Sequence, residues 1–157
     1  MIRIGQGFDV HPFAKGRQLH IGGVHVPYET GLLGHSDADV LLHAIIDALL
    51  GAAGLTDIGH LFPDTDELYQ GADSVGLLAK VIEKIAQESF TISNIDCTIL
   101  AEKPKMQPYL PAMKLVIANT CHIQPEQINI KATTMEQMGF IGRGEGIGAL
   151  AVALLEK

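Results

Sequence analysis

The sequence predicts an α+β fold in which helices pack mainly on one face of a single mixed sheet, four-stranded in type. The 157 residues, 47% of them hydrophobic, suit a single catalytic domain over 1–157 with one buried core. Segments rich in β-forming residues occur near both ends and in the middle of the chain. Segments whose apolar residues recur at helical spacing lie between them, which favours α+β architecture.

The expected strands follow from local composition. Residues 2–8 predict the first strand, and the Gly-containing "HIGGVHVP" at 20–27 predicts the second. Apolar alternation at 95–99 predicts a third, and "QINIKATT" at 127–134 a fourth. The final "GIGALAVALLE" at 146–156 is ambiguous, because a continuous apolar run fits both a strand and a helix.

The expected helices follow from spacing and end signals. Ser36 is a candidate N-cap, with an acidic residue three positions later as in a capping box, and apolar residues then recur at helical spacing. Gly51 and Gly54 end this helix. A second helix is expected over about 72–88. A third begins near Leu110, because proline is tolerated in a first helical turn.

Charge and composition exclude several classes of protein. Lys and Arg number 11 against 18 Asp and Glu, giving a net charge of −7, which argues against a nucleic acid or an anionic membrane as partner. Cys97 and Cys121 show no CxxC spacing, which suits a reducing compartment. The start lacks the pattern of a signal peptide, and the longest apolar region is interrupted by His43 and Asp47. These features predict a cytoplasmic protein.

One group of polar residues fits a metal site. Asp9 and His11 are two apart, so their side chains share one side of an extended chain. Asp39, His43 and Asp47 form a polar stripe at i, i+4 spacing on the first helix. Two imidazoles and a carboxylate with an open position are typical of catalytic zinc, whereas hydrogen-bonded core histidines and a helix cap explain the same residues without metal. Asp47 either orients His43 or is an ordinary helix-surface aspartate.

Other segments fit an anionic ligand. His35 and Ser36 lie at a helix N-terminus, which attracts phosphate, although capping explains Ser36 equally well. The turns "DIG" at 57–59 and "FPDTD" at 62–66 bear carboxylates, and solvated loops are the simpler interpretation.

Three further segments complete the candidates. "AEKPKM" at 101–106 sets two lysines beside a proline-fixed turn, which suits a base, a phosphate or plain solvent. "KATTMEQMGF" at 131–140 supplies a cation, the Thr134 hydroxyl and the Glu136 carboxylate, a set that suits phosphate with a hard metal ion. "GRGEG" at 142–146 is neither a P-loop nor a dinucleotide fingerprint and predicts a tight turn.

Several of these motifs together resemble one enzyme family. They are "GFDVH", "GHSDADVLLHAIIDALLGAAGLTDIGHLFPDTD", "GADS", the Pro-Lys turn at 104–105, "KATT" with Glu136, and "GFIGRGEGI". In this order and spacing the chain resembles the 2-C-methyl-D-erythritol 2,4-cyclodiphosphate synthases of the non-mevalonate isoprenoid pathway over nearly its whole length. That joint match is more specific than any single motif.

The resemblance implies an activity, metals and an assembly. The family converts 4-diphosphocytidyl-2-C-methyl-D-erythritol 2-phosphate to the 2,4-cyclodiphosphate and CMP, in a homotrimer with active sites between subunits. It implies zinc or manganese at Asp9, His11 and His43, and magnesium or manganese bound with the substrate diphosphate at Glu136. It also implies that His35 and Thr134 position the reacting groups or stabilise the transition state.

The resemblance further implies a set of substrate contacts, carried over position by position. The implied contacts are Asp9, Val10, His11, His35, Ser36, Asp57, Ile58, Gly59, Phe62, Pro63, Asp64, Thr65, Asp66, Ala101, Glu102, Lys103, Pro104, Lys105, Met106, Gln107, Thr133, Thr134, Met135, Glu136, Phe140 and Arg143. The segments 101–107 and 133–136 are expected to come from a neighbouring subunit. Two other functions use the same residues: a zinc-dependent phosphohydrolase, and a trimeric metal or nucleotide sensor without turnover.

Overall fold

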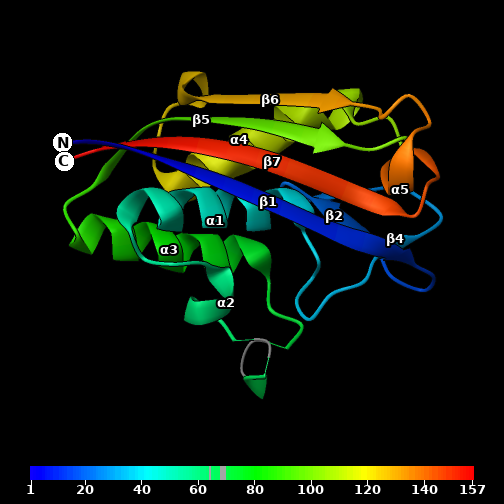
Figure 1. Ribbon diagram of the computed structural model, residues 1–157, viewed down its shortest axis with the longest axis horizontal. Helices are drawn as coiled ribbons and strands as arrows, with labels where there is room; N and C mark the ends of the chain where they lie inside the picture. The colour runs from blue at the N-terminus through cyan, green and yellow to red at the C-terminus, as the bar shows by residue number, and fades with distance from the viewer. Residues whose placement is uncertain (64, 68–69) are drawn as a thin grey trace.

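A five-stranded mixed sheet organises the computed structural model, which describes residues 1–63, 65–67 and 70–157 (Figure 1). Its strand order is β4-β1-β7-β5-β6, and a separate two-stranded sheet pairs β2 with β3. The strands are β1 (Ile2–Ala14), β2 (Leu19–Ile21), β3 (Val24–Val26), β4 (Gly31–Leu32), β5 (Thr91–Leu100), β6 (Ile128–Thr133) and β7 (Gly146–Glu156). The α+β class is confirmed, and the expectation of one four-stranded sheet is corrected to five strands plus a hairpin.

Long-range pairing explains the differences from the expected strands. The terminal apolar segment is a strand, β7, because it lies between β1 and β5 and pairs antiparallel with both. β1 extends past residue 8 to Ala14, where it pairs with the two-residue β4. The segment expected as one strand at 20–27 instead turns at Gly22 and Gly23, both at positive φ, to form the β2–β3 hairpin.

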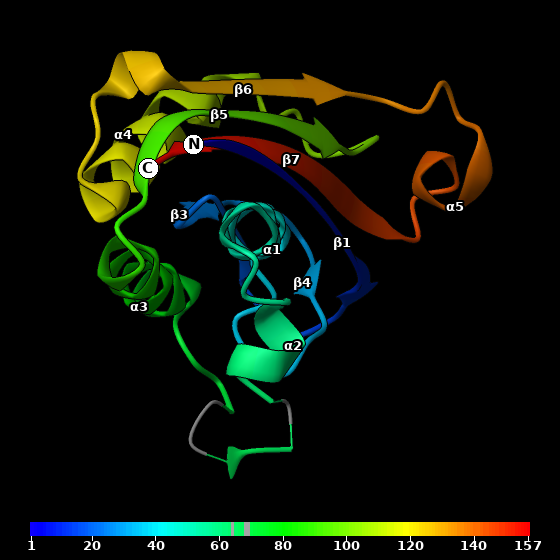
Figure 2. The same ribbon diagram turned by 60° about the vertical axis from the view of Figure 1, so that its left-hand side comes forward.

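The longer helices lie on one face of the sheet, whereas the short α5 lies beyond the end of the sheet, between β6 and β7 (Figure 2). The helices are α1 (Val40–Ala53), α2 (Ile58–Leu61), α3 (Ser74–Gln87), α4 (Leu110–Cys121) and α5 (Gly139–Gly142), with 3-10 turns at Gln107–Tyr109 and Pro125–Gln127. The second and third expected helices are confirmed as α3 and α4. Among the helices described, none is long and apolar enough to cross a membrane. The opposite face of the sheet carries exposed apolar side chains, among them Ile4, Phe8, Val10 and Val152.

The start of α1 corrects the sequence prediction. Asp39, not Ser36, is the N-cap, and its carboxylate accepts the backbone N–H of Leu42 at 3.1 Å. The same carboxylate accepts the N–H groups of Gly22 at 2.8 Å and Gly23 at 2.7 Å, so it also holds the hairpin. Burial raises the pKa of Asp39 to about 6. Gly54, with φ of 74°, ends the helix as expected, whereas Gly51 lies inside it.

Two glycines set the distance between β1 and α1. A Cβ atom on Gly5 would lie 2.0 Å from the Ala48 carbonyl oxygen, and one on Gly7 would lie 1.8 Å from the Ala44 carbonyl oxygen. Only a residue without a side chain allows this approach of helix to strand. The close packing brings the face of β1 that carries residues 5, 7, 9 and 11 directly under α1.

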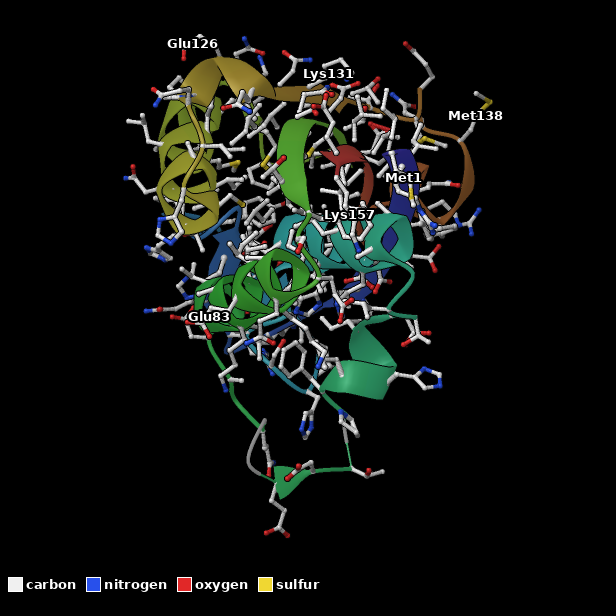
Figure 3. All side chains as sticks on the ribbon, turned by 90° about the vertical axis from the view of Figure 1, so that its left-hand side faces the viewer. Met1, Glu83, Glu126, Lys131, Met138 and Lys157 are labelled. Carbon is white, nitrogen blue, oxygen red and sulfur yellow. The ribbon has the colours of Figure 1, made fainter. Side chains whose placement is uncertain are left out.

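The ends of the chain lie side by side (Figure 3). The backbone N–H of Lys157 donates to the carbonyl oxygen of Met1 at 2.9 Å, which continues the pairing of β1 with β7 to the last residue.

Candidate metal centre and active site

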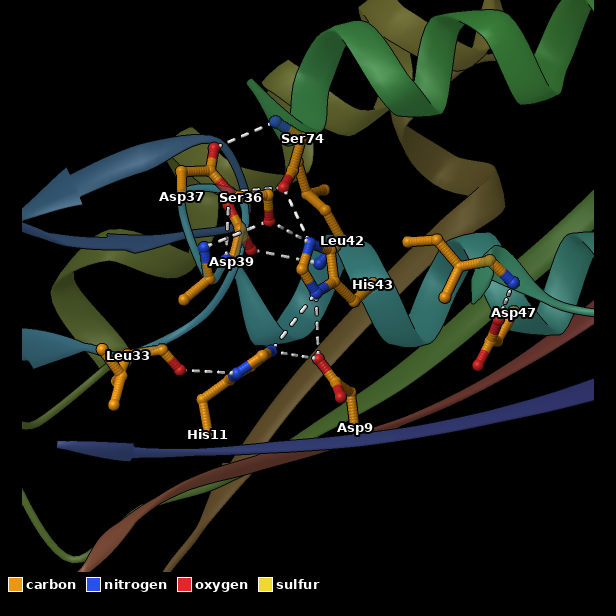
Figure 4. Close-up of polar contacts among 12 residues, drawn as sticks. Asp9, His11, Leu33, Ser36, Asp37, Asp39, Leu42, His43, Asp47 and Ser74 are labelled. Atoms are coloured by element: carbon orange, nitrogen blue, oxygen red, sulfur yellow. Dashed lines mark hydrogen bonds and ion pairs between the residues drawn. The ribbon is translucent and has the colours of Figure 1, made fainter. Parts of the chain in front are cut away.

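Asp9, His11 and His43 meet between β1 and α1 (Figure 4). Asp9 Oδ2 lies 2.8 Å from His11 Nε2 and 3.1 Å from His43 Nδ1, and the two imidazole nitrogens are 3.3 Å apart. Alternation along β1 puts Asp9 and His11 on the helix side, and His43 points down from α1. One ligand atom from each residue lies within 4.8 Å of the others, and among the described residues no further such group of three was found. The metal-ligand spacing seen in the sequence thus becomes a compact set of donors.

The charges of these groups are coupled. Burial raises the pKa of Asp9, but the hydrogen bonds and charges of His11 and His43 outweigh it, so the pKa lies below the ordinary value. Burial lowers the pKa of His11, but Asp9 outweighs it and raises the pKa above the ordinary value. Without a cation, the Asp9 carboxylate therefore favours a proton on the neighbouring His11 imidazole. A divalent ion would replace that proton as the partner of Asp9.

The other nitrogen of each imidazole is also engaged. His11 Nδ1 donates to the carbonyl oxygen of Leu33 at 2.9 Å, so Nε2 faces Asp9 and His43 and can offer its lone pair to a cation bound there. His43 Nε2 lies 3.0 Å from Ser36 Oγ and 2.9 Å from Ser74 Oγ. The hypothesis that Asp47 orients His43 is wrong, because the Asp47 carboxylate accepts the backbone N–H of Ile58 at 2.8 Å and anchors α2.

A pocket of about 340 Å³ opens over the three donors. It brings together many of the residues that the sequence predicted, and its lining is Asp9, His11, His35, Ser36, His43, Ile58, Gly59, Phe62 and Leu77. Within the described part of the chain, His35 Nε2 is buried without a hydrogen-bond partner. A buried imidazole nitrogen with no protein partner is suited to meet a polar group of a ligand.

The predicted site residues that do not line this pocket fall into three groups. The first group comes from β1 and from the segment around α2. Asp57 caps α2 and accepts from the His60 backbone N–H at 2.9 Å, so its carboxylate stands at the helix beside the pocket. Pro63, Thr65 and Asp66 follow α2 without lining the pocket. The Asp64 prediction falls outside the described residues. Val10 lies on the opposite face of β1, where its side chain is exposed.

The segments expected from a neighbouring subunit form a second pocket. It has a volume of about 180 Å³ and is lined by Ala101, Glu102, Pro104, Lys105, Met106, Gln107, Ala132, Thr133 and Thr134. The end of β5 and the end of β6 run parallel, which brings these two distant segments together. Lys103, Met135 and Glu136 lie on the same segments and do not line this pocket. The two pockets share no lining residue.

The third group lies near α5. Arg143 lines a pocket of about 460 Å³ together with Glu102, Lys103 and Tyr28. Its Nε donates to Glu145 at 2.6 Å. Phe140 is exposed on α5 and lines none of the pockets described above. Residues 131–140 are all exposed in the single chain.

Asp37 and Ser74 were missed by the sequence reasoning. Ser74 is fully buried at the first position of α3, and its hydroxyl donates to Asp37. In the sequence both residues resemble ordinary helix-capping positions, in "HSDAD" and "GADS". The only available signal was their place in motifs shared with the resembling family.

The fold and these pockets define a class: an α+β protein with a carboxylate–histidine group that could hold a metal ion, beside a pocket lined partly by the same residues. The chain belongs to the YgbB family, whose model matches residues 2–156.

Known proteins resemble it over the full length. The chain is 69% identical to the 2-C-methyl-D-erythritol 2,4-cyclodiphosphate synthase of Enterococcus faecalis, over 157 residues covering 100% of both chains. It is 45% identical to the bifunctional IspDF of Campylobacter jejuni, with a TM-score of 0.95, covering 99% of this chain and 42% of that one. It is 34% identical to IspF of Plasmodium falciparum in a CDP complex, with a TM-score of 0.86, covering 98% of this chain and 95% of that one.

Proposed function

We propose that this chain converts 4-diphosphocytidyl-2-C-methyl-D-erythritol 2-phosphate to 2-C-methyl-D-erythritol 2,4-cyclodiphosphate and CMP, as a phosphorus–oxygen lyase. The observation that carries the proposal is full-length similarity to synthases of this product, joined to the meeting of Asp9, His11 and His43. Residues 1–157 act as one catalytic domain, which is supported by one continuous cluster of buried apolar residues.

The metal centre is proposed to hold zinc or manganese. The donor set fits, because Asp9, His11 and His43 offer one carboxylate oxygen and two imidazole nitrogens close together. The Leu33 carbonyl fixes the His11 ring so that Nε2 faces the centre. When bound, such an ion supplies positive charge beside the substrate's phosphate groups.

The second pocket is proposed to bind the cytidine end of the substrate. Residues 101–107 surround the base, and 133–136 reach the diphosphate, with Glu136 on a magnesium or manganese ion. A CDP complex of a 34% identical relative supports a cytidine diphosphate ligand. The lysine at 105, which lines this pocket, brings positive charge to a chain that is acidic overall.

The active site is proposed to lie between subunits of a homotrimer. We call the pocket over Asp9, His11 and His43 the metal pocket. In one chain it has no residue in common with the second pocket, although the reaction requires both ends of one substrate to be held together. The face of the sheet opposite the helices exposes Ile4, Phe8 and Val152. Such a set of apolar side chains is typical of a surface covered by another subunit.

The chemistry requires positioning rather than a strong base. An oxygen of the 2-phosphate forms a bond to the β-phosphorus, and the bond from that phosphorus to the bridging oxygen breaks, so CMP leaves with the electron pair. Both reacting groups belong to one molecule, so a folded substrate gains the advantage of an intramolecular reaction. His35 and Ser36 on one side and Thr134 on the other are proposed to hold the phosphate oxygens and reduce the repulsion between anions.

The deciding experiment is a product assay with the cytidylyl substrate and magnesium. Equal amounts of CMP and cyclic diphosphate are expected, identified by mass. Linear phosphate products would instead indicate the zinc-dependent phosphohydrolase. Stoichiometric metal binding with no product would indicate the sensor.

A variant tests the metal ligands separately. His43→Ala removes one of three donors, so we expect loss of stoichiometric zinc, measured by metal analysis after dialysis, with the far-UV circular dichroism unchanged. His25→Ala is the control, because His25 is exposed on β3 and belongs to no group of metal donors among the described residues. Retained zinc in His43→Ala contradicts the ligand assignment.

A further inference from the structure

His43 differs from His11 in the partner of its outer nitrogen. Nδ1 of His43 faces Asp9 and His11, and Nε2 faces two hydroxyl groups, Ser36 Oγ at 3.0 Å and Ser74 Oγ at 2.9 Å (Figure 4). A carbonyl oxygen such as that of Leu33 accepts only, so it fixes the proton on the outer nitrogen of His11. A hydroxyl both donates and accepts, so a serine alone does not fix the proton of His43.

Asp37 removes this ambiguity at Ser74. The Ser74 hydroxyl donates to Asp37 Oδ1, and a carboxylate has no proton to return. Ser74 Oγ therefore presents a lone pair to His43 Nε2, which must donate. The result is a directed series of hydrogen bonds from His43 through Ser74 to Asp37, in which Nε2 carries a proton. A divalent cation that binds Asp9 can then take Nδ1 as a ligand, because any proton that Nδ1 shares with Asp9 leaves without disturbing this series.

The Asp37 carboxylate is held firmly enough to impose this direction. Oδ2 accepts the backbone N–H of Ser74 at 2.9 Å, and Oδ1 also accepts the backbone N–H of Asp39 at 3.1 Å. Ser74 is fully buried, so water does not compete for its hydroxyl.

Ser36 lacks an equivalent constraint. Its Oγ accepts the backbone N–H of Ala38 at 3.3 Å, and no carboxylate among the described residues holds its hydroxyl proton. That proton is free to turn toward the pocket, so Ser36 can donate to a ligand without releasing His43.

We propose that Ser74 and Asp37 are positioning residues that keep the proton of His43 on Nε2 and thereby keep Nδ1 available to a divalent cation. The inference deepens the proposed metal site and rests on it. A purely structural alternative is that the pair only ties the start of α3 to the segment before α1, in which case metal affinity does not depend on the Ser74 hydroxyl.

The tautomer can be read in the unmodified protein. Long-range ¹H–¹⁵N NMR of the zinc-free chain is expected to show a proton on His43 Nε2, whether or not Nδ1 shares a second proton with Asp9. A proton on Nδ1 with a bare Nε2 overturns the proposal, and this measurement needs no variant.

Variants then separate positioning from structure. Ser74→Ala is expected to mix the two tautomers and weaken zinc binding by about 10-fold or more, measured by competition with a chromophoric chelator. Asp37→Ala is expected to act through the same hydroxyl, so the double variant binds zinc about as well as the weaker single variant.

Asp73→Ala is the matched control, because the Asp73 carboxylate caps the same turn through the Val75 backbone N–H at 3.0 Å without contacting His43. We expect it to lower the unfolding temperature of the zinc-free protein and to leave zinc affinity within about twofold. If the unmodified chain binds zinc and Ser74→Ala binds it equally well, the positioning role is refuted. If the unmodified chain binds none, the proposed metal site itself is refuted.

Discussion

At the scale of single residues, His35 is the side chain whose surroundings most clearly point to a ligand. Its Nε2 atom is buried and, within the described chain, has no hydrogen-bond partner, while its ring lines the pocket over Asp9, His11 and His43. Leaving a buried polar atom unpaired costs about 1–3 kcal/mol, so a phosphate oxygen that accepts or donates there recovers that cost on binding.

His35→Ala is therefore expected to reduce turnover without releasing the metal. Loss of one preorganised donor to a reacting phosphate lowers kcat by about 10²- to 10³-fold. Steady-state kinetics of the zinc-loaded protein measures this loss, and metal analysis should give the same stoichiometry as the unmodified chain. If zinc is lost together with activity, His35 belongs to the metal centre and its separate role is disproved.

The residue scale also shows what sequence can reveal about a site. Asp9, His11 and His43 were recognisable because their residue types are distinctive and two of them are spaced for one strand face. Ser74 and Asp37 were not, because their partners are 31 and 37 positions away along the chain and serine is common at helix starts. Local patterns reveal the donors, whereas the groups that orient the donors depend on the folded contacts.

At the scale of elements, the contact between α1 and β1 determines the geometry of the centre. Gly7 lies two residues before Asp9, and the carbonyl oxygen that a Cβ at position 7 would meet belongs to Ala44, next to His43. Any widening of this contact moves His43 away from both ligands on the strand.

Gly7→Ala is accordingly expected to destabilise the fold and weaken metal binding together. A Cβ 1.8 Å from the Ala44 oxygen forces the helix outward, at a cost of about 3 kcal/mol in the free energy of unfolding. Urea denaturation and chelator competition measure the two effects. Gly51→Ala is the control, because its Cβ would lie 3.9 Å from the nearest atoms and alanine favours a helix. Equal stability of the two variants would contradict this account of the interface.

Elements also show why some boundaries could not be predicted. Ser36 and Asp39 are both good N-caps by local rules, and Asp39 is used because its carboxylate also meets Gly22 and Gly23 from the hairpin. The last segment fits strand or helix locally, and pairing with β1 and β5 decides for strand. By contrast, α3 carries its own helical periodicity and α4 follows prolines that permit its start, so the range expected for α3 and the start expected for α4 were right.

At the scale of the whole molecule, the two pockets present halves of one proposed site. The metal pocket lies between β1 and α1, and the other lies where β5 and β6 end, with separate linings. Residues 131–140, which include the end of β6 and the segment after it, are all exposed, among them the apolar Met135, Met138 and Phe140. Both facts are explained if each metal pocket is completed by the second pocket of a neighbouring copy.

Mixed assemblies test this arrangement. His43→Ala disables the metal pocket and Thr134→Ala the other, so each homogeneous variant is expected to be nearly inactive. When the two chains are co-expressed with different affinity tags, random assembly joins an intact metal pocket to an intact second pocket at about one quarter of the interfaces. Every doubly tagged trimer contains both variants and has one such interface out of three, so it should recover about a third of the unmodified activity. His43→Ala mixed with His35→Ala should recover none, because both changes lie in the same half. Recovery no greater than the mean of the two single variants would mean that each chain builds its site alone.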